Sequence, residues 1–259
     1  MILQDIIHII ESVAPLSYQE DWDNSGLQVG DRNAKVNAAL LTIDVTESVV
    51  NEAIDKGCDL IVSHHPLLFR GLKQLTGATP QERCAEAAIR HGIAIYSAHT
   101  TIDSWLHGVS GRMAAKIGVV DCRILHPSEA DASVGLGVIG SLAEAIELED
   151  LIERIAQVFG IARGGIRYVE GDKRQVQRVA LCGGAGADLL DVAIKEGADV
   201  YVSADFKYHE MQSAYQHISV IDMDHWVSEQ FTREIFAELL SGHVKTYVAE
   251  SDRSPVKCW

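Results

Sequence analysis

Two short segments of this sequence combine histidines and carboxylates at spacings that suit metal binding. The segment IVSHHPLLFRG (61–71) ends an apolar run on the adjacent residues His64 and His65 and follows them with a proline. Near the C-terminus, DHWVSEQ (224–230) has a histidine and a glutamate four positions apart, which lie on one face of a helix. Imidazole and carboxylate ligands together suit Zn, Mn, Fe, Ni or Co.

The adjacent histidines indicate two ions rather than one. Side chains that leave a strand in succession point in diverging directions, so one ion cannot easily bind both. Two ions about 3.5–4 Å apart can, with a carboxylate or a water between them. Either Asp103 or Glu229 could be that bridge. The residues expected to hold the two ions are His64, His65, Asp103, His225 and Glu229.

An internal repeat indicates how these residues are positioned. Residues 50–65 (VNEAIDKGCDLIVSHH) match residues 190–205 (LDVAIKEGADVYVSAD), 140 positions later. Residues 88–103 match residues 214–229 at an offset of 126, which aligns a histidine and a carboxylate four positions after it in both copies. Two matches in the same order favour a duplicated β-α-β-α-β unit over the general likeness of α/β units. The difference in offset falls in connecting loops, where length changes are tolerated.

Hydrophobic periodicity and turn residues predict an α/β protein with strands and helices in alternation. We expect two similar three-layer units with mostly parallel sheets, residues 1–126 and residues 127–259. The expected strands are 36–43, 59–63, 93–97, 133–140, 176–182, 198–203, 218–222 and 244–249. The expected helices are an N-terminal one, 46–56, 80–91, 108–117, 147–159, 187–196, 207–216 and 226–241.

Ligand sites of open α/β sheets lie beyond the C-terminal ends of the strands, and the chain's polar clusters follow the predicted strands. His99 is a candidate for orienting the site or binding substrate. Asp205 and His209 are candidates for hydrogen bonding to the ligands or for proton transfer. The glycine-rich CGGAGADLL (182–190) lacks the third glycine of a GxGxxG motif, so a tight turn near the site is favoured over a phosphate contact.

Composition and charge narrow the class of protein. The 259 residues are 47% hydrophobic and 23% charged, as in a globular protein. No apolar run approaches the roughly 20 residues that cross a bilayer, and the first residues do not have the pattern of a signal peptide. Five scattered cysteines, none in a CxxC pair, favour the cytoplasm and argue against a thiolate zinc site. The formal charge of −15 disfavours a nucleic-acid partner.

The segments SHHPLLF, AHTTIDSW, DHWVSEQ and DWDNSGLQVG resemble the Ngg-interacting-factor-like family, also called the type 2 GTP cyclohydrolase I family, over nearly the whole chain. The resemblance implies a dinuclear metal centre on the five residues named above. It also implies two similar α/β domains and a homohexameric ring with its metal sites facing an internal cavity. The family often has glycine before the distal ligand histidine, where this chain has Asp224.

Two functions fit these observations. The first is a metal-dependent hydrolase of a nucleotide-like or phosphate-bearing small molecule. The resemblance adds GTP cyclohydrolysis, in which water adds at C8 of the purine and formate leaves, but no residue of the sequence selects GTP. The alternative is a non-catalytic, metal-binding hexameric scaffold or regulatory interaction protein. Chelation should unfold a scaffold whose ions are structural, whereas an enzyme should lose activity first.

Overall fold

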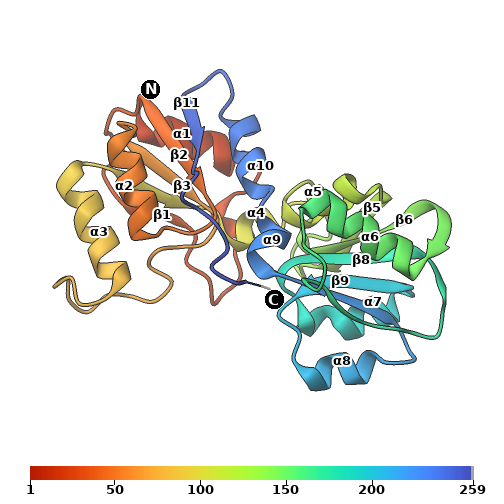
Figure 1. Ribbon diagram of the computed structural model, residues 1–259. Helices are drawn as coiled ribbons and strands as arrows, with labels where there is room; N and C mark the ends of the chain where they lie inside the picture. The colour runs from red at the N-terminus through yellow and green to blue at the C-terminus, as the bar shows by residue number, and fades with distance from the viewer. Residues whose placement is uncertain (258–259) are drawn as a thin grey trace. The chain divides into compact units, whose positions relative to one another are not determined.

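The computed structural model describes residues 1–257, which form two compact α/β units (Figure 1). Unit 1 consists of residues 1–102 and 232–253, and unit 2 consists of residues 103–231 with the described residues after 253. The chain therefore leaves unit 1 and returns to it. The division into 1–126 and 127–259 contains no such return and stays a prediction.

Unit 1 is built on a five-stranded sheet in the order β1-β4-β3-β2-β11. The strands β2, β3, β4 and β11 run parallel, and β1 pairs antiparallel to β4 at one edge. The strands are β1 (Gly26–Val29), β2 (Ala38–Thr42), β3 (Leu60–Ser63), β4 (Ala94–Ser97) and β11 (Lys245–Val248). The helices are α1 (Leu3–Glu11), η1 (Leu16–Tyr18), α2 (Glu47–Asp55), α3 (Pro80–His91), α4 (Thr100–Asp103, whose last residue belongs to unit 2) and α10 (Thr232–Leu239).

Unit 2 is built on a six-stranded mixed sheet in the order β5-β6-β8-β9-β10-β7. The central strands β8, β9 and β10 are parallel, and the outer strands β5, β6 and β7 pair antiparallel to their neighbours. The strands are β5 (Val120–Pro127), β6 (Gly135–Glu147), β7 (Arg167–Val169), β8 (Gln175–Ala185), β9 (Val200–Ala204) and β10 (Ser219–Met223). The helices are α5 (Val109–Ile117), α6 (Leu148–Phe159), η2 (Ala187–Leu189), α7 (Leu190–Lys195), α8 (Tyr208–Ala214) and α9 (His225–Glu229).

Each sheet is covered on both faces, which gives the expected three layers. In unit 2, Leu181 and Val202 pack with α5 and α6, whereas Ala180 and Tyr201 pack with α7 and α8 on the other face. This division follows from the alternation of side chains along a strand. In unit 1, α2 and α3 pack on one face of the sheet, and α1 and α10 lie on the other (Figure 1).

The two units share a duplicated core. The order β1-β4-β3-β2 of unit 1 corresponds to β7-β10-β9-β8 of unit 2. In both units the antiparallel edge strand, β1 or β7, pairs with the corresponding parallel strand, β4 or β10. One contact repeats at the offset of 140. The carboxylate of Asp59 accepts a hydrogen bond from the backbone N–H of Asn37 at 2.7 Å, and that of Asp199 accepts one from Gln177 at 2.9 Å. The predicted α/β class and duplication are thus confirmed.

Three strands and one helix break were not predicted. The strands β1 and β7 are short edge strands, and β5 has exposed residues at both ends, so they lack a strong apolar signal. The predicted helix 226–241 is two helices, α9 and α10, because its apolar residues serve different cores. Phe231 packs in the core of unit 2, whereas Phe236 is buried in unit 1. The predicted helix 187–196 begins instead as the 3₁₀ turn η2.

Cys58, Cys84, Cys122 and Cys182 are free thiols, and Cys258 lies outside the described residues. Within residues 1–257, no helix combines the length and apolar character needed to cross a bilayer.

Candidate metal centre

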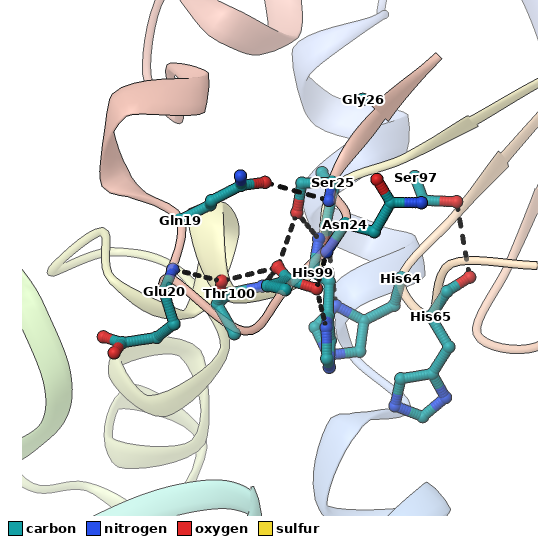
Figure 2. A network of polar contacts seen from close by, with 12 residues as sticks. Gln19, Glu20, Asn24, Ser25, Gly26, His64, His65, Ser97, His99 and Thr100 are labelled. Atoms are coloured by element: carbon teal, nitrogen blue, oxygen red, sulfur yellow. Dashed lines mark hydrogen bonds and ion pairs between the residues drawn. The ribbon is translucent and has the colours of Figure 1, made fainter. Parts of the chain in front are cut away.

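Three histidines of unit 1 come together at the C-terminal ends of β3 and β4. His64 and His65 follow β3 directly, and His99 lies two residues after β4 (Figure 2). Their ring centroids are 4.9–5.4 Å apart. One ligand atom from each can be chosen so that all three lie within 4.8 Å of one another. His64 is fully buried and the other two are partly exposed, so the group could hold a metal ion.

Hydrogen bonds fix the orientation of these three rings. Nδ1 of His64 lies 3.0 Å from the carbonyl oxygen of Ala98, which can only accept a hydrogen bond. Nδ1 of His65 lies 2.9 Å from Oδ1 of Asp44, and Nδ1 of His99 lies 2.7 Å from Oδ1 of Asp23. A neutral imidazole that donates from Nδ1 carries its lone pair on Nε2. Metal-binding histidines commonly have this second contact, which also raises their basicity.

Asp23 is the centre of a polar network that holds His99. Its second oxygen, Oδ2, accepts hydrogen bonds from the hydroxyl groups of Ser25 at 2.9 Å and Thr100 at 2.6 Å, and from the Thr100 N–H at 3.1 Å. Burial raises the pKa of Asp23, but hydrogen bonds from His99 and Thr100 lower it by more, to well below its usual range. The segment DWDNSGL therefore contributes a buried carboxylate that orients a histidine.

In unit 2, a histidine and a carboxylate lie together on the short helix α9. Nε2 of His225 is 3.3 Å from Oε1 of Glu229, and the Glu229 side chain is almost fully buried. Nδ1 of His225 is 2.7 Å from Oδ2 of Asp205, so this histidine has the same second contact as those of unit 1. Asp205 has a positive φ of 61°, a conformation that aspartate adopts more readily than most residues. Asp224 caps α9, since its Oδ1 accepts a hydrogen bond from the Val227 N–H at 3.0 Å.

The glycine-rich end of β8 makes room for the Glu229 carboxylate. A Cβ atom on Gly184 would lie 2.2 Å from Oε1 of Glu229, and Gly184 has a φ of +65°. Its N–H donates to the hydroxyl of Ser228 at 2.8 Å, and the Gly183 N–H donates to the hydroxyl of Ser110 at 3.2 Å. Because the Gly183 and Gly184 amides already have partners within the protein, this end of the strand serves close packing rather than phosphate binding.

Asp103 and His209, the other residues of unit 2 predicted from the sequence, differ in how far they are buried. Asp103 is the last residue of α4 and is partly buried. Burial, together with the charges of Asp103 and Glu229, raises the pKa of the Cys182 thiol to about 12, so this thiol stays protonated beside them. His209 is exposed, and its Nδ1 contacts Oε1 of Gln212 on the same helix at 3.2 Å.

Sequence reasoning missed the two carboxylates of unit 1 that orient histidines, Asp23 and Asp44. Asp23 precedes His99 by 76 residues, so no local spacing connects them. Asp44 lies just after β2, the neighbour of β3 in the sheet, and its position beyond that strand was the signal that could have identified it. His99 joins His64 and His65 in one group, although the sequence set it apart from the metal ligands.

The duplicated sheet and the histidine–carboxylate groups at the strand ends define the chain as an α/β protein with a candidate metal centre. Comparison with known proteins then identifies its family. The family model Duf34/NIF3 (NGG1p interacting factor 3) matches residues 1–255. A Clostridium acetobutylicum protein named GTP cyclohydrolase 1 type 2 homolog is 33% identical over 242 residues, which cover 93% of this chain and 90% of that protein.

Similar proteins also occur in an animal and among solved structures. NIF3-like protein 1 of Drosophila melanogaster is 31% identical and covers 98% of this chain and 88% of its own length. The crystal structure of a Staphylococcus aureus hypothetical protein has a TM-score of 0.90 at 25% identity, with 99% of both chains covered. The chain belongs to the Duf34/NIF3 family.

Proposed function

We propose that this protein binds two divalent metal ions per chain and uses them to hydrolyse a small molecule. The proposed ligands are His64, His65, Asp103, His225 and Glu229. The observation that supports this most directly is the shared orientation of the histidines, each with Nδ1 on an oxygen acceptor. Together with a buried glutamate, these form a nitrogen and oxygen donor set that fits Zn, Mn, Fe, Ni or Co.

When bound, the ions would lower the pKa of a coordinated water and polarise the bond to be cleaved. The chain's own residues supply proton transfer. His99 has its Nδ1 on the ionised Asp23, which would stabilise the ring after Nε2 takes up a proton. Asp205 instead orients His225, a proposed metal ligand, through its contact with Nδ1. We assign His99 the role of proton carrier and Asp205 that of a positioning residue.

The proposed substrate is a nucleotide-like or phosphate-bearing small molecule, because the bacterial relatives are named GTP cyclohydrolase 1 type 2 homologs. The proposal includes the cytoplasmic location that the cysteine usage favours and the homohexameric ring implied by the family resemblance. Nucleic acid is disfavoured as a partner by the net charge of −15.

Metal analysis of the purified protein tests the proposal. We expect about two ions per chain, as in two-metal hydrolase sites, and a lower content in His65→Ala and Glu229→Ala. His91→Ala is the matched control, because His91 is exposed at the end of α3, and should retain the full content. No metal in the purified protein and no uptake from added Zn, Mn or Fe would overturn the proposal.

Activity measurements distinguish an enzyme from a metal-binding scaffold. A hydrolase screen of nucleotides and phosphoesters, with Mn, Zn or Fe supplied, should reveal turnover that His65→Ala and Glu229→Ala abolish while the folded assembly persists. Unfolding of the protein on chelation, without turnover of any compound, would instead indicate structural ions.

A further inference from the structure

Two exposed aromatic side chains lie beside the histidine group of unit 1. Trp22 is 58% exposed and Phe69 is 45% exposed. Their ring centroids are 6.1 Å apart, and each is close to the ring of His99, Trp22 at 5.9 Å and Phe69 at 6.3 Å. Large aromatic surface is normally buried in a folded protein, so a pair left open next to a group with metal-binding geometry calls for a function.

Polar contacts, rather than burial, hold this aromatic pair in place. Trp22 adjoins Asp23, whose carboxylate is bonded to His99 and Thr100. Phe69 follows Leu68, whose backbone carbonyl and N–H group both make hydrogen bonds. The Leu68 carbonyl accepts from Nδ2 of Asn24 at 2.7 Å, and the Leu68 N–H donates to Oε1 of Gln28 at 3.2 Å. The segment that follows Trp22 thus connects the two aromatic residues, and a ligand would meet a preorganised surface.

We propose that Trp22 and Phe69 form a stacking subsite for a planar heteroaromatic ring, such as a purine, and present it to His99. This inference rests on the proposed function, whose substrate class it makes more specific. Stacking on aromatic side chains accepts any planar ring because each ring has a π-face. Glu20 and Asp21 lie next to Trp22 in the sequence, and their carboxylates disfavour an acidic peptide or a phosphate directly on this surface.

Binding of two matched probes tests the subsite. Guanosine 5′-monophosphate carries a guanine base on its ribose phosphate, and ribose 5-phosphate lacks this base. Their affinities for the full-length protein can be measured by calorimetry, with and without added metal. We expect only the first to depend on the aromatic pair. Trp22→Leu and Phe69→Leu should each weaken its binding about tenfold, within the range of base–aromatic stacking, whereas Trp22→Phe should stay close to the wild type. Tyr208→Leu is the control, since Tyr208 is 71% exposed in unit 2.

Three results would overturn the inference. One is equal binding of both probes. Another is unchanged binding of guanosine 5′-monophosphate in both leucine variants. The third is a change in the assembly's mass by light scattering in Trp22→Leu without a change in probe affinity, which would assign the pair to a contact between copies of the chain. Absence of metal would defeat the proposed function alone, because the metal-free titrations still report on the aromatic pair.

Discussion

At the scale of single residues, one arrangement recurs in four histidines. Nδ1 contacts a backbone carbonyl in His64 and a carboxylate in His65, His99 and His225. The contact fixes the ring and selects the nitrogen that carries the lone pair. The exposed His209 instead contacts the side-chain amide of Gln212. A carboxylate or backbone carbonyl as the Nδ1 partner therefore separates these four site histidines from this exposed one.

Replacing the buried partner of His99 should impair proton transfer and leave the metal in place. Ser25 and Thr100 now donate hydrogen bonds to the Asp23 carboxylate. In Asp23→Asn, the new NH₂ group is itself a donor and would face one of these donors without an acceptor between them. We expect turnover of a substrate found in the hydrolase screen to fall about 10²–10⁴-fold, the usual contribution of general acid–base catalysis, whereas the metal content measured by elemental analysis stays unchanged. Asp21→Asn changes the same charge at an exposed neighbour and is the control. Equal losses in both variants would contradict the role of Asp23.

A methyl group at Gly184 should displace the Glu229 carboxylate. The added Cβ would lie 2.2 Å from Oε1 of Glu229, so the helix carrying it must shift, at a cost of about 1–3 kcal/mol in stability. Gly197→Ala is the control, because Gly197 has a similar φ of +73° but no atom within 4 Å of the added methyl. We expect only Gly184→Ala to lose metal, measured by elemental analysis. Similar loss in both variants would show that backbone strain alone is responsible.

Much of the candidate site could be predicted from sequence because its residues follow strands. The C-terminal ends of parallel strands share one edge of a sheet, so the position after β3 was enough to select His64 and His65. Asp23 belongs to an irregular segment before β1. Its contact with His99 depends on how that segment folds back, and no periodicity encodes this.

At the scale of elements, the duplication conserves small contacts as well as strand order. Asp59 and Asp199 each begin a buried strand and accept N–H groups from the start of the neighbouring strand. Each contact joins the N-terminal end of one strand to its neighbour in the sheet. What the sequence did not predict is how the sheets end. On the side away from β3, β2 pairs with the parallel strand β11. On the side away from β9, β8 pairs with the antiparallel strand β6.

The contact of Asp199 makes the stability of unit 2 depend on pH. Burial raises the pKa of Asp199, but the ion pair with Lys173 and bonds from the Arg178 and Gln177 N–H groups lower it by more. The folded state therefore binds fewer protons than the unfolded state near pH 4, and the stability contributed by the carboxylate is present above the unfolded pKa of about 3.9 and lost as pH falls through the lower folded value.

Asp199→Asn should remove this dependence. We expect a loss of about 1.5–3 kcal/mol at neutral pH, the usual range for hydrogen bonds to a charged group, and a flatter decline in stability below about pH 4. Urea unfolding at several pH values measures both. Asp172→Asn, at an exposed neighbour, is the control. A parallel decline in Asp199→Asn and the wild type would contradict the assignment.

At the scale of the whole molecule, the sequence of unit 1 is interrupted by unit 2 and resumes after it. The returning segment, residues 232–253, supplies α10 and the edge strand β11. It is anchored by Phe236, which is fully buried, and by Asp252, whose carboxylate accepts the Ile43 N–H at 2.6 Å. The sequence predicted this strand but not which sheet it joins, since pairing of distant strands has no local signal.

The anchoring of the returning segment predicts that the two units respond separately to core truncation. Phe236→Ala removes a buried ring from unit 1 and should cost about 3–5 kcal/mol, a large part of a typical domain's stability. Hydrogen exchange followed by mass spectrometry should then be faster in β2 and β3 but unchanged in β8 and β9. Phe159→Ala, which removes a ring from the core of unit 2, is the matched counterpart and should give the reverse pattern. Equal acceleration in both sheets from either variant would show that the units unfold together, and the assignment of residues 232–253 to the stability of unit 1 alone would fail.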